Sequence, residues 1–387
     1  MRLLILHLAQ VAGGAERTTS NLLRYLNRTK VQHITLVTSE ALRSYFPATY
    51  DHFIDASAHG LHYGLSGWRI LYADGLRFSE ILREQTPDIV LGMMHYASAL
   101  AVFGARFSSS RAVTIASFRG PFYEYMRHYE RGLRRILFLR ATVAATALLA
   151  DRVIVPSVGT KQELQRRFLG RAGKTIVIPN GIDQESAEQA AAEPLPVAYS
   201  APAGHVVLCA VARLAVEKNL HLLLAAFRIV YKTHPVALMI IGDGPERASL
   251  EQAVRDWQMS SAVTFVGYQA NVYPFLRCAD LFIHTCQFEG FGYAILEAMA
   301  CGTAVIATDC PHGPREIIGA NQYGMLVAPD DVQALAGAIR FLLDNAAERD
   351  VLAARGLARA RMLSISQMVQ AYEQVLGGLV SVRQGRT

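Results

Sequence analysis

The chain has 387 residues, of which 52% are hydrophobic and 18% charged, and its formal net charge is +6 at pH 7. This composition indicates a globular protein, and the length exceeds one ordinary core and suits two domains. No apolar stretch reaches the roughly 20 residues needed to cross a bilayer. The apolar run after Met1 and Arg2 is short, so we expect no signal peptide.

The cysteines lie in the second half of the chain and lack the spacing of metal ligands. They are Cys209, Cys278, Cys286, Cys301 and Cys310. A reducing cytoplasm is the simplest location for such a set, and we predict no metal site.

The first half alternates between buried strands and helical segments. Its continuous Val, Ile and Leu runs are typical of parallel sheets covered on both faces. The predicted strands are 2–8, 33–38, 88–94, 112–118, 152–156 and 175–178. We assign residues 1–183 to a first Rossmann-like domain.

The turn after the first strand reads Gly13-Gly14-Ala15-Glu16-Arg17. Two glycines there let backbone N–H groups approach a ligand, although neither G-x-G-x-x-G nor a Lys-Ser/Thr phosphate loop is present. A tight turn that needs positive φ explains the same glycines equally well.

Two further residues follow predicted strands of this domain. His95 could contact an acceptor substrate, or it could cap its strand. Arg119 could neutralise phosphate or substrate charge, or it could be an ordinary surface cation.

Basic and aromatic residues crowd the segment 122–140. Its cations are Arg127, His128, Arg131, Arg134, Arg135 and Arg140. Such a surface suits anionic lipid headgroups, and no nucleic-acid motif accompanies it. We therefore expect peripheral attachment to the inner face of a membrane and no nucleic-acid partner, with a merely solvated helix face as the alternative. The apolar stretch 136–150 is interpreted as a helix packed on a sheet.

The segment 184–205 is rich in Ala, Pro and Glu and is interpreted as an interdomain linker. A second series of strands follows at 206–212, 236–241, 263–266, 281–286, 304–308 and 325–327. We assign 206–365 to a second Rossmann-like domain and expect a C-terminal helix at about 366–387 to pack back on the first. The predicted architecture is α/β, with two doubly wound domains facing across a cleft, and ligands at the carboxyl ends of strands.

Two cations follow the first strand of the second domain, in the sequence V-A-R-L-A-V-E-K-N. Arg213 and Lys218 precede a helix that begins at Asn219 or Leu220. Cations at this end of a helix oppose its dipole, and a bound anion would reverse that penalty. The alternative is that both are solvated surface charges.

The segment from Glu289 to Glu297 reads E-G-F-G-Y-A-I-L-E and follows a predicted strand. A helix beginning near Gly292 places positive N–H groups around Phe291 and Gly292, which favours an anion. Glu297 falls in apolar surroundings, where a carboxylate needs hydrogen-bond donors such as a ribose diol. The alternatives are a helix cap for Glu289 and a structural ion pair for Glu297.

These motifs together resemble the retaining GT-B glycosyltransferases with an E-x7-E motif, the "glycosyl transferases group 1" and family 4 type. By that resemblance, Glu289 approaches the donor sugar and Glu297 holds the nucleotide ribose. Arg213 and Lys218 bind the diphosphate, as in the related motif G-R-L-x-x-E-K-N. Gly14 contacts the donor phosphates.

The resemblance also implies that Tyr268 borders the nucleotide base, and a half-buried Tyr packed on the linker is the alternative. Many members of the family carry a His where this chain has Arg119, so a His-assisted mechanism is in doubt.

The predicted function is sugar transfer from a nucleotide sugar, a UDP-sugar, to a lipid-linked or envelope glycan. An epimerase or phosphorylase and a non-catalytic binding protein are the alternatives. We expect no cofactor and no metal requirement, because the chain has no D-x-D triplet near the site. The acids Asp330 and Asp331 are interpreted as the cap of a helix that begins near Val332.

Overall fold

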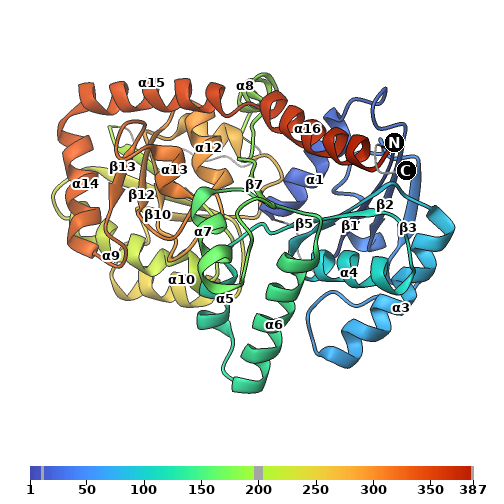
Figure 1. Cartoon of the computed structure of the whole chain (residues 1–387). Helices are drawn as coiled ribbons and strands as arrows, with labels where there is room; N and C mark the ends of the chain where they lie inside the picture. Colours follow the sequence, from blue (N-terminus) through green and yellow to red (C-terminus); the bar gives the residue numbers. More distant parts are fainter. Residues whose placement is uncertain (10–12, 196–203, 385–387) are drawn as a thin grey trace. The chain divides into compact units, whose positions relative to one another are not determined.

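The computed structural model describes residues 1–9, 13–195 and 204–384. The chain forms two compact units, of which the first comprises Met1–Asn180 with Ile365–Thr387 and the second comprises Gly181–Ser364. Figure 1 shows the helices and strands of both units and labels many of them. Within the segment interpreted as a linker, helix α8 (Gln184–Ala191) belongs to the second unit, and residues 196–203 lie outside the described residues.

The first unit is built on a seven-stranded parallel sheet with the strand order β3-β2-β1-β4-β5-β6-β7. Its strands are β1 (Arg2–His7), β2 (His33–Thr38), β3 (His52–Asp55), β4 (Ile89–Met93), β5 (Val113–Ser117), β6 (Arg152–Val155) and β7 (Thr175–Val177). Because β1 pairs with both β2 and β4, the strand order reverses at this point. Such a switch opens a crevice at the carboxyl ends of the two strands.

Helices cover both faces of this sheet. They are α1 (Gly14–Tyr25), α2 (Glu40–Arg43), α3 (Trp68–Gln85), α4 (Met94–Phe107), α5 (Phe122–Tyr129), α6 (Leu133–Leu149), α7 (Val158–Arg167) and α16 (Ile365–Gln384). In Figure 1, α3, α4 and α6 lie below the sheet, and α1 and α16 lie above it.

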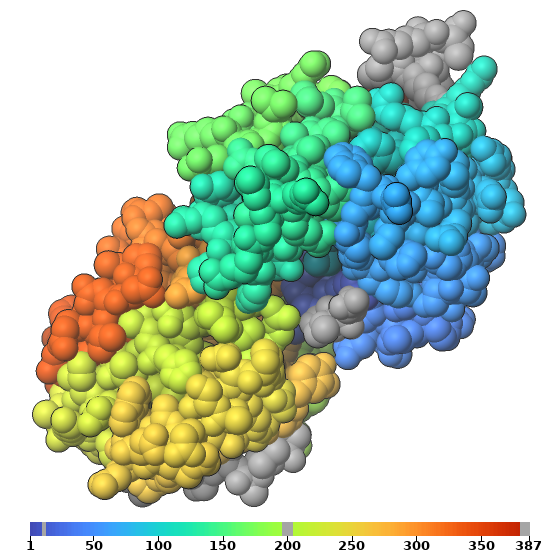
Figure 2. Space-filling view, turned by 90° about the horizontal axis from the view of Figure 1, so that it is seen from below, coloured from blue at the N-terminus to red at the C-terminus, as the bar shows by residue number. Residues whose placement is uncertain are grey.

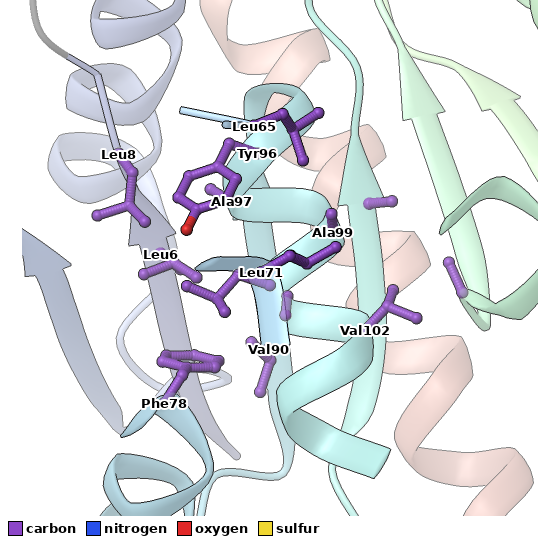
Figure 3. Packing of buried hydrophobic residues seen from close by; sticks show 14 of the residues in the cluster. Leu6, Leu8, Leu65, Leu71, Phe78, Val90, Tyr96, Ala97, Ala99 and Val102 are labelled. Atoms are coloured by element: carbon purple, nitrogen blue, oxygen red, sulfur yellow. The ribbon is translucent and has the colours of Figure 1, made fainter. Parts of the chain in front are cut away.

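Successive side chains of β1 enter two different cores, one on each face of the sheet, which explains why its sequence is apolar at successive positions. Leu6 contributes to one core, where Figure 3 shows it beside Leu71 and Phe78 of α3. Its neighbour Ile5 contributes to the opposite core, which contains Leu22 of α1. Successive side chains of a strand point to opposite faces, so a sheet covered on both sides needs an unbroken apolar strand.

The last helix, α16, packs within the first unit. Tyr372 of α16 is 1% exposed and belongs to the same core as Leu22. Glu373 accepts a hydrogen bond from the backbone N–H of Asn27 at 2.9 Å and pairs with Lys30 at 2.8 Å. Residues 385–387 of the predicted C-terminal helix lie outside the described residues.

The second unit contains a six-stranded parallel sheet with the order β10-β9-β8-β11-β12-β13. Its strands are β8 (Val206–Val211), β9 (Val236–Ile241), β10 (Val263–Gly267), β11 (Leu281–His284), β12 (Ala304–Thr308) and β13 (Met325–Val327). Here the order reverses between β8 and β11.

The helices of the second unit also cover both faces of their sheet. They are α8, the short 3₁₀ helix η1 (Val216–Lys218), α9 (Leu220–Tyr231), α10 (Arg247–Asp256), α11 (Tyr273–Cys278), α12 (Tyr293–Ala300), α13 (Pro314–Ile318), α14 (Val332–Asp344) and α15 (Ala346–Met362). One core of the sheet contains residues of α9, α10 and α14, and the other contains residues of α8, α11 and α12.

The prediction of two doubly wound α/β domains is confirmed. The predicted strands are all present, with ends that differ by at most two residues, and the structure adds β3. The stretch interpreted as a packed helix is α6. Within the described parts of the chain, no helix is both long enough and apolar enough to cross a membrane.

Candidate active site at the switch point of the second sheet

The loops that follow β8 and β11 are held together at the point where the strand order reverses. The backbone N–H of Gln287 donates to the carbonyl of Glu217 at 2.8 Å. The Thr285 hydroxyl donates to the carbonyl of Lys218 at 2.9 Å. Since neighbouring parallel strands end at the same edge, these bonds bring the predicted cations and Glu289 into one site.

Lys218 and Glu289 form the centre of this site. The Lys218 Nζ donates to Glu289 Oε2 at 2.7 Å, and the two side chains are 21% and 22% exposed. Burial opposes both charges, but the Lys218 ammonium and His284 hold the pKa of Glu289 well below its usual range. Burial likewise opposes the charge of Lys218, and Cys286 and Glu289 outweigh it and raise the pKa of Lys218. Both groups are therefore ionised at neutral pH.

A histidine and a cysteine complete the cluster. His284 Nε2 lies 3.2 Å from Cys286 Sγ and 3.7 Å from Glu289 Oε2. Burial lowers the pKa of His284, but Cys286 and Glu289 more than compensate and raise it to about 9. The imidazole is thus a second cation beside Glu289.

Arg213 adds a third cation at the same edge. Its guanidinium is 53% exposed and donates to Glu217 Oε1 at 2.6 Å. The cluster thus gathers the basic side chains of Arg213, Lys218 and His284 at one edge of the sheet, which suits an anionic ligand.

Two glycines let neighbouring loops press against this site. A Cβ on Gly242, which has φ +130°, would lie 1.9 Å from the carbonyl oxygen of Ala212, the residue before Arg213. A Cβ on Gly313 would lie 2.1 Å from the carbonyl oxygen of Phe291. Because real Cβ atoms do not approach so closely, only glycine permits this packing.

The loop after β12 also fixes the backbone of Glu289. The Glu289 N–H donates to the Pro311 carbonyl at 2.7 Å, and the His312 N–H donates to the Glu289 carbonyl at 2.8 Å. The carboxylate itself accepts from the Gly290 N–H at 3.0 Å. Glu289 is therefore held by its backbone and side chain, and it does not cap α12.

The remaining residues of the E-x7-E segment follow the predicted strand, loop and helix. Gly292 is the N-cap of α12 with φ +109°, a conformation that favours glycine. Phe291 and Glu297 are each 4% exposed, so Glu297 is buried as predicted.

Tyr268 follows β10 and is 65% exposed. It is more exposed than the half-buried Tyr of the alternative, and linker residues 196–203 lie outside the described residues.

The turn at Gly13 and Gly14 is held by Glu16, an interaction that the sequence analysis missed. Glu16 Oε2 accepts from the Gly13 N–H at 2.6 Å, and Glu16 Oε1 lies 2.9 Å from Nε2 of the buried His7. Gly14 is the first residue of α1 and is exposed. Residues 10–12, which precede this turn, lie outside the described residues.

Arg119 lies just after β5 and donates hydrogen bonds to α1, to α16 and to Asn180, which follows β7. It donates to the Thr18 hydroxyl of α1 at 2.8 Å, to the Tyr372 hydroxyl of α16 at 3.2 Å and to the Asn180 side chain. The side chain is partly buried, so the alternative of an ordinary surface cation is wrong. All three partners are neutral.

His95 lies at the start of α4 beside aromatic rings. Its ring centroid is 5.3 Å from that of Phe118 and 4.2 Å from that of Phe122. Burial lowers the pKa of His95 to about 3, so the imidazole is neutral. Its Nε2 has no hydrogen-bond partner in the described structure, and the interpretation as a strand cap is unsupported.

The adjacent acids Asp330 and Asp331 both accept hydrogen bonds within the second unit. Asp331 caps α14 by accepting from the Ala334 N–H at 2.8 Å, as predicted. Asp330 accepts from the Asn219 side chain at 2.7 Å.

Sequence reasoning missed the role of His284 and Cys286. The spacing of the cysteines alone does not reveal this group, whereas the sequence His284-x-Cys286-x-x-Glu289 does. In an extended chain, side chains two residues apart point to the same side, and the turn after Cys286 brings Glu289 back to both.

Comparisons with known proteins agree with this fold. The model of "Glycosyl transferases group 1" matches residues 195–359, and the model of "Glycosyltransferase Family 4" matches residues 12–186. The chain is 33% identical to the lipopolysaccharide core biosynthesis glycosyltransferase LpsE of Rhizobium meliloti over 284 residues, which cover 73% of each protein. The chain therefore belongs to the glycosyltransferases of the GT-B type.

Two other similarities are more distant and extend over more of the chain. One is a Campylobacter jejuni enzyme, N-acetylgalactosamine-N,N'-diacetylbacillosaminyl-diphospho-undecaprenol 4-alpha-N-acetylgalactosaminyltransferase, which is 24% identical over 86% of this chain and 88% of its own length. The other is the crystal structure of Anabaena HepE in complex with UDP. It has a TM-score of 0.77 at 19% identity and covers 98% of this chain and 100% of that one.

Proposed function

We propose that this glycosyltransferase transfers a sugar from a UDP-sugar to a lipid-linked or cell-envelope glycan, with retention of the anomeric configuration. The observation that carries the proposal is the cluster of Lys218, Glu289 and Arg213 at the switch point of the second sheet. In this proposal, Lys218 and Arg213 stabilise the departing nucleotide diphosphate.

In this mechanism the acceptor hydroxyl attacks the anomeric carbon on the face from which the nucleotide leaves. The donor phosphate takes the acceptor proton. Arg213 and Lys218 stabilise the negative charge that grows on the diphosphate, aided by the N–H groups at the start of α12 near Phe291 and Gly292. Because that charge is larger in the transition state, these contacts raise the rate of the chemical step.

The carboxylates orient the donor in this scheme. Glu289 is held in place by its backbone bonds and by Lys218, and it positions the sugar. Glu297 accepts hydrogen bonds from the ribose diol. Tyr268 borders the base, and Gly14 contacts the donor phosphates.

Known relatives support the choice of substrates. HepE has been crystallised with UDP, with UDP and glucose, and with UDP-glucose. The Campylobacter relative is named for a diphospho-undecaprenol substrate, and LpsE is named for lipopolysaccharide core biosynthesis. We accordingly propose that this chain uses a nucleotide-sugar donor and a glycolipid acceptor.

We also propose that the acceptor is reached at an anionic membrane surface. On α6, Leu133 and Leu137 are 71% and 57% exposed, and on α3, Trp68 is 52% exposed. The Trp68 ring lies 4.9 Å from that of Phe138 on α6, so the two helices are adjacent. Figure 2 shows the corresponding blue and teal segments on one face of the first unit.

Cations accompany these apolar side chains. Three arginines are exposed here: Arg127 in α5, Arg131 between α5 and α6, and Arg134 at the start of α6. Apolar side chains that enter the headgroup layer beside such cations are typical of interfacial attachment.

The first test is a screen of nucleotide sugars for slow hydrolysis, because it needs no acceptor. We expect one or more UDP-sugars to release UDP and free sugar. Product analysis with a glycolipid acceptor then distinguishes the functions: a new glycoside supports transfer, and an isomerised donor or a sugar phosphate indicates an epimerase or phosphorylase. Binding without any product indicates a non-catalytic protein, and the absence of both hydrolysis and binding contradicts the proposal.

A further inference from the structure

The cluster around Glu289 contains the three side-chain types that bind zinc. His284 Nε2, Cys286 Sγ and a Glu289 carboxylate oxygen all lie within 4.8 Å of one another. We propose that these residues form a binding site for Zn²⁺, and that zinc bound there inhibits the enzyme reversibly.

The distances fit a tetrahedral ion. Zinc bonds are about 2.3 Å to sulfur and about 2.0–2.2 Å to nitrogen and oxygen, so the ligand atoms of a tetrahedral site lie about 3.3–3.6 Å apart. The separations here are 3.2 Å from Cys286 Sγ to His284 Nε2, 3.7 Å from His284 Nε2 to Glu289 Oε2 and 3.8 Å from Cys286 Sγ to Glu289 Oε2. Small side-chain movements bring all three to an ion.

The site is open on one side. His284 and Cys286 are 6% and 2% exposed, whereas Glu289 and Lys218 are each about one-fifth exposed. An ion can therefore reach the cluster from the side of Lys218, and water fills its fourth position. Zinc binds the thiolate form of cysteine and the neutral form of histidine, so any proton on Cys286 Sγ or His284 Nε2 passes to the solvent on binding.

Zinc must displace Lys218 to bind. The Lys218 ammonium donates a hydrogen bond to Glu289 Oε2 at 2.7 Å. A divalent ion bound to the same oxygen would repel this ammonium. The site thus holds either the Lys218–Glu289 pair or the ion. The inhibitory effect rests on the proposed function, because both residues then leave their proposed positions for diphosphate and sugar.

The surroundings indicate a reversible site. His284 Nδ1 is buried and has no hydrogen-bond partner in the described structure. Histidines at permanent zinc sites almost always donate this second N–H to an oxygen, which strengthens the metal bond. Since that bond is missing and Lys218 competes, zinc should exchange with the solvent.

The test of the site itself uses Co²⁺, whose bond to a thiolate gives a charge-transfer absorption band. The full-length wild-type chain should show this band and should bind Zn²⁺ in calorimetry, with no binding of Mg²⁺, which prefers oxygen ligands. Cys286→Ser should lose the band, and its zinc affinity should fall by at least about tenfold. Cys278→Ser is the matched control, because Cys278 is an exposed free thiol outside the cluster; this variant should behave as wild type.

The variants also separate the site from the proposed function. Cys286→Ala is made alongside Cys286→Ser, and circular dichroism checks that each is folded. With an active donor, zinc should inhibit the wild type and Cys278→Ser but not Cys286→Ser, and chelator should restore activity. The proposal is overturned if the wild type gives no thiolate band or if Cys286→Ser binds zinc as tightly as the wild type. Because the band needs no turnover, a failure of the proposed function would leave this result unaffected.

Discussion

The Lys218–Glu289 pair allows one prediction to be worked out in detail. Lys218→Ala removes the cation that we assign to the departing diphosphate. Loss of one preorganised donor to developing negative charge typically lowers kcat by about 10² to 10³, or about 2.7–4 kcal/mol. We expect a loss of this size for Lys218→Ala, with a smaller change in the affinity for the donor.

The stability cost of the same substitution follows from the pair's partial burial. The two charges are 2.7 Å apart, which corresponds to a gross attraction of about 6 kcal/mol at an effective dielectric constant of about 20. Desolvation offsets much of this. Since exposed pairs contribute about 0–1 kcal/mol and breaking buried ones costs about 3–5 kcal/mol, we expect Lys218→Ala to cost about 1–3 kcal/mol. In this variant Glu289 keeps the Gly290 N–H and His284 as partners. The expected loss of stability therefore stays below the upper limit for breaking a buried ion pair.

Arg213→Ala completes the comparison. Its guanidinium is half exposed, so we expect a smaller loss of stability than for Lys218→Ala, together with a lower kcat. The assays are steady-state donor hydrolysis or transfer, and urea unfolding. Lys232→Ala is the control, because Lys232 is exposed just beyond the opposite end of α9. Near wild-type kcat in both Arg213→Ala and Lys218→Ala would refute the diphosphate assignment.

Three further predictions address other parts of the structure. Glu297→Ala should weaken UDP binding in calorimetry while the protein stays folded, because a buried charge is removed rather than left unpaired; unchanged affinity would make Glu297 structural. Since burial lowers the pKa of His95 from 6.5 to about 3, only the unfolded state takes up this proton as pH falls below 6.5, and stability should drop by up to about 1.4 kcal/mol per pH unit. His95→Phe should lose this component in urea unfolding, and an identical pH dependence would contradict the assignment. The chain should float with anionic liposomes at low salt and less at high salt, since each cation near the surface adds about 1 kcal/mol; equal recovery on neutral vesicles, or none on either, would refute membrane attachment.

The fold could be predicted from the sequence because both sheets are buried on two faces. Strands such as β9, which is apolar at every position, can be recognised without their neighbours. The strand β3 was missed because it lies at the edge of the sheet and only Phe53 and Ile54 of its four residues are apolar. Edge strands need less apolar surface and therefore leave a weaker pattern.

The candidate site was predictable only in part, because its motifs identify residues but not their partners. Charge and position indicated Arg213, Lys218 and Glu289, whereas the pairing of Lys218 with Glu289 depends on bonds between loops far apart in the chain. The packing of Gly242 against Ala212 depends on the adjacency of β8 and β9, which no local pattern shows.

The central claim is transfer from a nucleotide sugar with retention of configuration, and the anomeric configuration of the first product tests it most directly. Once a donor and an acceptor are found, the reaction is run in excess chelator and the product glycoside is analysed by NMR. We predict full activity without added metal, because Arg213, Lys218 and the start of α12 supply the positive charge for the leaving diphosphate. We also predict the donor's own anomeric configuration in the product. An inverted product would contradict the assigned mechanism, and activity that returns only with magnesium or manganese would contradict its metal independence.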